Sequence, residues 1–165
     1  MKKVIFILFM PLVVQGQMNS TWLIGYGNWA TRARMVFDST NYVLTQENRK
    51  MGFEGTEATI SDANGNLLMS SNGVWIADAT GDTMMNGSGL NPGAEVNAYP
   101  KGLLLPYANI ILPYPNDTNK YVLFHHTCEW DGISYPSYQV FYSVIDMTLN
   151  GGLGGVDSLQ KNVIA

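Results

Sequence analysis

The sequence predicts an all-β fold in which short antiparallel strands are joined by tight turns. After residue 16, no long window of the chain shows the period of an amphipathic helix. Short runs rich in β-branched and aromatic residues recur instead, and 17 glycines and 9 tyrosines suit such a chain. Turn sequences such as DANG, NGSG, PNDTN and LNGGLGG separate the runs.

The strand-like runs fall in an order that resembles repeated antiparallel units. The last four runs follow one another as a meander of four strands. The stretch 57–79 shows a similar antiparallel arrangement, with a hairpin and a third strand. Units of this size predict antiparallel four-stranded blades of a partial β-propeller, and a β-sandwich fits the period nearly as well. The expected strands are 22–26, 34–37, 57–61, 66–70, 73–77, 109–112, 120–128, 139–146 and 160–164.

The stretch ISDANGNLL, residues 60–68, allows two interpretations. Asp62, Asn64 and Asn66 place oxygen atoms at every second residue, as a calcium loop does, but leucine and glycine stand where that loop needs its glycine and its bidentate glutamate. Asn64-Gly65 is a dipeptide typical of tight hairpin turns. We therefore expect a structural turn with Gly65 at positive φ and no metal.

The first residues have the pattern of a bacterial-type secretory signal. Lys2 and Lys3 precede an apolar run from 4 to 14, which is too short to span a bilayer of about 30 Å as a helix. Gly16 offers a small residue for cleavage, so residues 1–16 are expected to be removed and 17–165 to form the exported chain. The expected location is the outer surface or the extracellular space, with no membrane span after cleavage.

Charge and motif patterns argue against several classes of site. The net charge is −4 and no cluster of Lys and Arg is present, which argues against nucleic acid as a partner. The GGLGG run at 151–155 lacks the Lys and Ser/Thr of a phosphate loop. His126 and Cys128 lie two apart on one face of a strand, which does not make a ready nucleophile–base pair. We expect no catalytic residue, no metal and no cofactor.

Strand parity singles out one acid as a structural residue. Asp146 falls on the same face as Val140, Tyr142 and Val144, so it is expected to be at least partly buried. A buried carboxylate needs hydrogen bonds, and the backbone amides of the following turn are the obvious donors.

Aromatic residues in or beside the expected loops are the candidate surface contacts. Loops are where such folds present binding surface, and Tyr and Trp combine an apolar ring with a polar edge. The candidates are Trp29, Trp130, Tyr135 and Tyr138.

Three segments resemble a known group of proteins. They are EGTEATISDANGNLLMSSNGVWI, ILPYPNDTNKYVLFH at 111–125 and YSVIDMTLNGGLGGV at 142–156. In this order they resemble the N-terminal region of large exported proteins of gliding-type bacteria, which often end in a type IX secretion sorting domain or a gliding-motility-associated C-terminal domain. The resemblance implies a WD40-like β-propeller and makes 17–165 the N-terminal blades of a longer protein, whose remaining blades would be a partner. It carries over no catalytic residue.

Two classes of function follow from these observations. The first is a non-catalytic secreted or cell-surface module for protein or glycan contact, associated with adhesion or gliding. The alternative is a part of a carbohydrate-active secreted enzyme whose catalytic residues lie outside this chain. The first is favoured because no nucleophile–base constellation is apparent.

Overall fold

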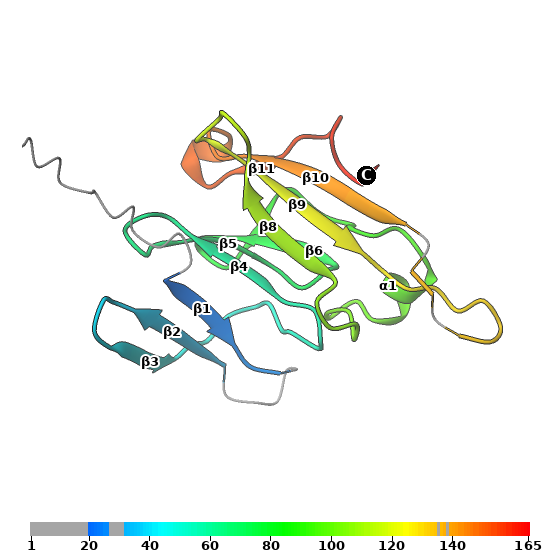
Figure 1. The fold of residues 1–165 in the computed structure, drawn as a ribbon, viewed down its shortest axis with the longest axis horizontal. Coiled ribbons are helices and arrows are strands. Elements are labelled where there is room, and N and C mark those ends of the chain that lie inside the picture. Colours follow the sequence, from blue (N-terminus) through cyan, green and yellow to red (C-terminus); the bar gives the residue numbers. More distant parts are fainter. Residues whose placement is uncertain (1–19, 27–31, 135, 138) are drawn as a thin grey trace, which may run out of the picture.

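The computed structural model of the protein describes residues 20–26, 32–134, 136–137 and 139–165. These residues form two sheets, a small one of three strands and a large one of nine (Figure 1). The strands are β1 (Thr21–Ile24), β2 (Ala33–Phe37), β3 (Tyr42–Gln46), β4 (Ala58–Ser61), β5 (Leu67–Ser71), β6 (Trp75–Asp78), β7 (Thr83–Ser88), β8 (Asn109–Pro113), β9 (Lys120–His126), β10 (Val140–Asp146), β11 (Gly155–Val156) and β12 (Val163–Ile164), and the helical elements are α1 (Ala94–Ala98) and the 3-10 turn η1 (Asn150–Gly152). The predicted all-β class is confirmed.

The large sheet is barrel-like and nearly closed. Its strand order is β4-β5-β6-β7-β11-β10-β9-β8, and β12 pairs with β10 beside this path. All pairs are antiparallel except β11 with β7, where Gly155 lies opposite Met85. The two end strands, β4 and β8, lie against each other, and the Asn109 amide group at the start of β8 is 3.0 Å from Ser71 Oγ at the end of β5.

One hydrophobic core fills the space inside this sheet. Strands β4 to β11 all contribute inward side chains to it, so the first group of strands (β4–β7) and the second (β8–β11) share one core. Its buried members are Ile60, Met69, Ile76, Met84, Leu90, Ile111, Tyr121, Leu123, Ile145 and Val156. Along β9, Tyr121, Leu123 and His125 point inward; strand alternation predicts that they share a face but not that this face is the buried one.

The small sheet, in the order β1-β2-β3, packs on the large one through a second cluster that includes Leu23 and Phe53. Figure 1 shows it as a separate layer below β4 and β5. The buried Arg49 side chain joins the small sheet to the segment that follows it, because it donates to the carbonyl oxygens of Ile24 (2.8 Å), Ala33 (3.2 Å) and Met51 (3.2 Å). Its guanidinium also lies over the Phe53 ring, 4.9 Å from the centroid.

Two expected turns are instead parts of strands. The NGSG run was expected to be a turn, but residues 86–88 continue β7 through a bulge, with Trp75 opposite Ser88 and Ala77 opposite Thr83. Asn86 takes φ 56° there, a left-handed conformation that Asn tolerates. In the GGLGG run, the turn ends before Gly155, which with Val156 forms β11 and pairs with both β10 and β7. Strand β3 was not expected at all.

The turn at Asp62 has a different form from a two-residue hairpin turn. The Gly65 N–H donates to the Asp62 carbonyl at 3.1 Å, which makes Ala63 and Asn64 the central residues. Gly65 follows them with φ 84°, so its predicted positive φ is present, whereas Asn64 has no positive φ. The Asp62 carboxylate accepts the backbone N–H groups of Asn64 and Asn66 at 2.8 Å each. The Asp62 carboxylate at the start of this pattern therefore stabilises the turn through hydrogen bonds.

Asp146 is half-buried and does not belong to the core. It shares a face with Val140 and Tyr142, as parity predicts, but this is the outer face of β10, and Asp146 lies opposite Lys120. The Thr148 hydroxyl and backbone N–H donate to its Oδ1 at 2.6 and 2.8 Å. These hydrogen bonds lower the pKa of Asp146 and are the donors expected from the following turn.

Gly65→Val is expected to destabilise the protein by about 1–2 kcal/mol, because a β-branched residue is strained at positive φ. A Cβ atom there would also lie 2.8 Å from Ser20 Oγ. Gly65→Asn is the matched control, since Asn tolerates this conformation better. Urea unfolding of the three proteins measures the difference, and equal stability of the Val and Asn variants would contradict the turn geometry.

Candidate functional site

A chain of buried polar side chains runs beside β9 and β10. His125 Nδ1 lies 2.8 Å from Asn91 Oδ1, and His125 Nε2 lies 2.9 Å from Ser143 Oγ. The Asn91 amide nitrogen donates to the Gly73 carbonyl at 2.9 Å, so its oxygen faces His125 and accepts the Nδ1 proton. His125 Nε2 then accepts the Ser143 hydroxyl proton, and Ser143 Oγ accepts the backbone N–H of Asn162 at 3.0 Å.

Ser143, His125 and Asn91 have the side-chain chemistry of a nucleophile, a base and an orienting amide. Unlike the residues of an active site, they are not accessible to a substrate. Ser143 and Asn91 are 0% exposed and His125 is 1% exposed, so no substrate carbonyl can approach the hydroxyl. Burial lowers the pKa of His125 to about 4, helped by the charges of His126 and Lys161. The imidazole is therefore neutral at pH 7, and the chain of hydrogen bonds ties β9, β10 and the C-terminal segment together.

The small sheet exposes an unusual surface. Residues opposite each other in antiparallel strands share a face, and on the face toward the large sheet the β1 residues Thr21 and Leu23 are buried. The other face points outward and holds one polar side chain, Gln46. We call its remaining side chains the apolar face: Trp22, Ile24, Ala33, Met35, Phe37, Tyr42 and Leu44.

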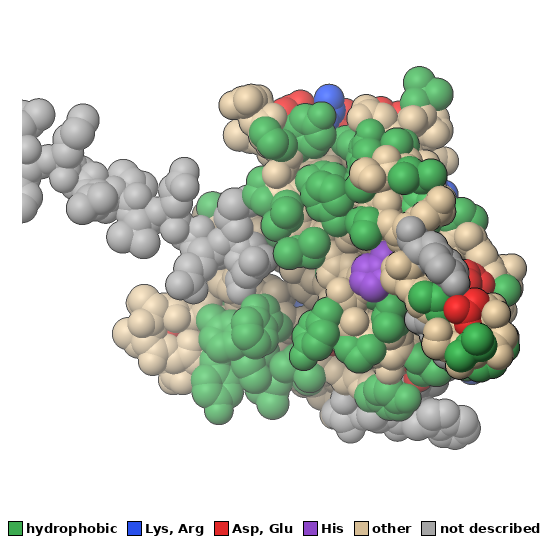
Figure 2. Space-filling model, turned by 45° about the vertical axis from the view of Figure 1, so that its right-hand side comes forward, with side chains coloured by type: hydrophobic (Ala, Val, Ile, Leu, Met, Phe, Trp, Pro, Cys, Tyr) green, Lys and Arg blue, Asp and Glu red, His purple; other side chains and the backbone are tan. Residues whose placement is uncertain are grey.

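Several side chains of the apolar face are strongly exposed. Trp22 is 53%, Tyr42 57% and Leu44 56% exposed. The Trp22 and Phe37 rings meet edge to face, with centroids 5.0 Å apart, and Phe37 and Tyr42 are tilted at 6.3 Å. Figure 2 shows hydrophobic side chains gathered over the small sheet, and a second group over the outer side of the large sheet.

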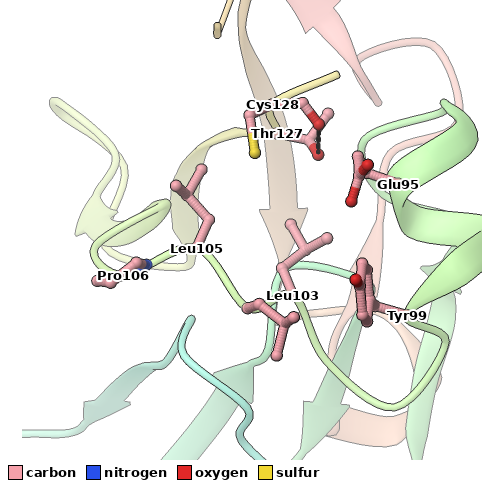
Figure 3. A pocket seen from close by; sticks show the side chains of 8 residues that line it. Glu95, Tyr99, Leu103, Leu105, Pro106, Thr127 and Cys128 are labelled. Carbon is pink, nitrogen blue, oxygen red and sulfur yellow. Dashed lines mark hydrogen bonds between the residues drawn. The ribbon is translucent and has the colours of Figure 1, made fainter. Parts of the chain in front are cut away.

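A pocket of about 310 Å³ lies between α1, the segment 103–106 and the end of β9 (Figure 3). Glu95 and Tyr99 stand on one side of it, and Leu105 and Pro106 on the other. Its lining residues are Glu95, Tyr99, Leu103, Leu104, Leu105, Pro106, Thr127 and Cys128. Apart from the Glu95 carboxylate, the pocket is mainly apolar.

The pocket does not activate its cysteine. Burial raises the pKa of the Cys128 thiol, and the nearby carboxylates of Glu95 and Glu129 raise it further. The thiol is therefore mostly protonated near neutral pH and a weak nucleophile. His126 contacts the Ser137 hydroxyl at 3.1 Å through its ring nitrogen. The His126 ring nitrogen is thus engaged with a hydroxyl group.

Of the four aromatic residues predicted as surface contacts, the structure describes only Trp130. Trp29, Tyr135 and Tyr138 lie outside the described residues. Trp130 is 54% exposed in the loop after β9. Sequence reasoning missed the apolar face, because β3 was not expected and because Trp22 was assigned only to a strand.

Comparisons with known proteins give no relative from which a function could be transferred. A search of family models, curated proteins and solved structures finds no match to this chain. Among the described residues, no helix has the length and hydropathy needed to cross a membrane. Within the same residues, His, Cys, Asp and Glu side chains form no group of three that could hold a metal ion.

The buried His125 predicts a specific pH dependence of stability. Its pKa is about 4 when folded and about 6.5 when unfolded, so the unfolded chain binds the extra proton between these values. The contribution of the neutral His125 side chain to the free energy of unfolding should be fully present above pH 6.5. The free energy of unfolding should then fall by up to about 3 kcal/mol as the pH drops to about 4.

Chemical denaturation between pH 7 and 4.5 measures this effect. His125→Gln should flatten the slope, and His126→Gln, which removes only a contribution smaller than that of burial, should leave most of it in place. A slope that survives His125→Gln would show that another group causes the dependence.

Proposed function

We propose that this protein is a non-catalytic, exported surface module that binds a protein or glycan through the apolar face. The observation that most directly supports this proposal is that Trp22, Tyr42 and Leu44 are exposed on a sheet face with a single polar side chain. Soluble proteins rarely leave a contiguous apolar surface uncovered unless it meets a partner. Tyr and Trp are also enriched at protein interfaces, where their rings are buried and their polar edges stay wet.

The tilt of the rings favours a protein partner over a flat polysaccharide. The planes of Trp22 and Phe37 differ by 65°, and those of Phe37 and Tyr42 by 47°. Sugar rings on a flat surface stack best on aromatic rings that lie in one plane. Tilted rings with aliphatic neighbours such as Leu44 fit an irregular protein surface better.

We infer further that residues 17–165 are the N-terminal blades of a WD40-like β-propeller in a longer exported protein of the type IX secretion group. The sequence resemblance at 54–76, 111–125 and 142–156 supports this inference. The outer face of β8 also exposes Ile110 (52%) and Leu112 (41%), which gives remaining blades a surface to cover. The competing arrangement is a self-contained barrel, supported by the pairing of β7 with β11.

Trp22→Ala is expected to weaken binding by about 2 kcal/mol, or roughly 30-fold in Kd, because an aromatic anchor at the centre of an interface contributes on this scale. The measurement is a glycan array together with binding to whole cells of the source species, for the unmodified protein and the variant. Circular dichroism establishes that the variant is folded.

Trp130→Ala is the matched control, because Trp130 is as exposed as Trp22 but lies in a loop after β9. If only Trp130→Ala weakens binding, contact is made through the loops and the apolar face is not the site. Turnover of a substrate in a parallel hydrolase panel, lost on mutation within 17–165, would contradict the non-catalytic assignment.

A further inference from the structure

The sequence contains four asparagine residues that are directly followed by glycine. They are Asn64, Asn72, Asn86 and Asn150. Asparagine is a thermolabile residue, and a following glycine has no side chain to keep its backbone nitrogen away from the asparagine side chain. The folded structure holds the four pairs in different surroundings, so their chemical stability should differ.

Two of the pairs are held by hydrogen bonds and packing. Asn72 is 0% exposed, and its side-chain amide makes hydrogen bonds through both its nitrogen and its oxygen atom. The N–H of Gly73 donates to Ser71 Oγ at 3.2 Å. Asn86 Nδ2 donates to the Val156 carbonyl at 3.2 Å, and the glycine that follows Asn86 is buried. In both pairs the side-chain amide must leave a hydrogen bond before it can react.

The pair at Asn64 is exposed, but its backbone nitrogen is engaged. The Gly65 N–H donates to the Asp62 carbonyl at 3.1 Å. The Asp62 carboxylate also accepts the Asn64 N–H at 2.8 Å, which fixes the backbone of this turn. The Gly65 nitrogen must therefore leave its hydrogen bond before it can approach the Asn64 side chain.

The pair at Asn150 has none of these restraints. Asn150 and Gly151 are both exposed, in the turn between β10 and β11, at φ 51° and 66°. Among the described residues, no group forms a hydrogen bond with the Asn150 side chain or with the Gly151 N–H. An atom at the Cβ position of Gly151 would have no heavy atom within 4 Å, so the space around this nitrogen is open.

We propose that Asn150 is a site of spontaneous deamidation in the folded protein. The Gly151 backbone nitrogen attacks Asn150 Cγ. The bond between them forms, the Cγ–Nδ2 bond breaks, and Nδ2 leaves as ammonia with the proton of the Gly151 N–H. Water then opens the cyclic imide at one of its two carbonyls. Opening at Cγ gives aspartate, whereas opening at the backbone carbonyl gives isoaspartate, in which the main chain runs through Cγ.

The position of this turn determines what the modification changes. The Leu149 carbonyl accepts the N–H groups of Gly152 and Gly154 at 3.1 Å each, and the turn leads into β11, which joins β10 to β7. Isoaspartate adds a methylene group to the main chain inside this turn and displaces these donors. The pairing of β11 with β7 should therefore weaken. Both products also add a negative charge to a chain whose net charge is −4.

Peptide mapping by mass spectrometry of the purified protein, kept folded at mildly alkaline pH, compares all four asparagines in one sample. Asn150 should convert about tenfold faster or more than Asn72 and Asn86, because these need local opening before they can react. It should also convert faster than Asn64. In urea, where the fold is lost, the four rates should approach one another. Conversion of Asn64 or Asn72 as fast as that of Asn150 in the folded protein would overturn the proposal.

A matched pair of variants tests the site by its product. Asn150→Gln should remove most of the isoaspartate that a methyltransferase specific for isoaspartate detects, because the longer side chain forms a cyclic imide much more slowly. Asn64→Gln makes the same change in another exposed turn and should leave most of the isoaspartate in place. Circular dichroism establishes that both variants are folded. An isoaspartate content that Asn150→Gln does not lower, or that only Asn64→Gln lowers, would show that Asn150 is not the site.

Discussion

The guanidinium of Arg49 ties the small sheet to the segment 51–53, which packs with Leu67 and Ala77 of the large sheet. Carbonyl oxygens of Ile24, Ala33 and Met51 accept its hydrogen bonds, and the Glu47 carboxylate lies 3.7 Å away. Buried carbonyls without a donor are costly, and Arg is the side chain that can supply several donors in one plane. Burial lowers the pKa of Arg49, and Glu47 opposes this change. The apolar face is therefore presented by a sheet that Arg49 helps to hold in place.

A second recurring interaction makes the short strands possible. In seven turns of the described part of the chain, an aspartate accepts the backbone N–H of the residue two positions later through its carboxylate, which fixes the turn without a longer loop. These hydrogen bonds lower the pKa of several of the carboxyls, so their contribution is present at neutral pH and is lost as the pH falls below about 3.8. The aspartates are Asp38, Asp62, Asp78, Asp117, Asp131, Asp146 and Asp157.

Local patterns in the sequence predicted local structure well and long-range structure poorly. The alternation in β9 correctly separated His125 from His126, although it did not say which face is buried, and Asn64-Gly65 correctly marked a turn with Gly65 at positive φ. The closure of the large sheet was not predictable, because β11 consists of Gly155 and Val156 within a glycine-rich run and pairs with a strand distant in sequence. The role of Arg49 was missed for the same reason, since its partners lie on other strands. The apolar face was missed because alternation assumes that the outward side of a strand is polar.

Arg49 is expected to hold the small sheet in place, so Arg49→Met should loosen that sheet more than the large one. Hydrogen exchange of the Arg49→Met variant, followed by mass spectrometry of peptides, tests it most directly. Removing a buried cation with several hydrogen bonds should cost about 2–4 kcal/mol locally. In this variant we expect the backbone amides of β1, β2 and β3 to lose protection from exchange, while those of β9 and β10 keep it. Unchanged protection in the small sheet, or an equal loss in both sheets, would contradict it.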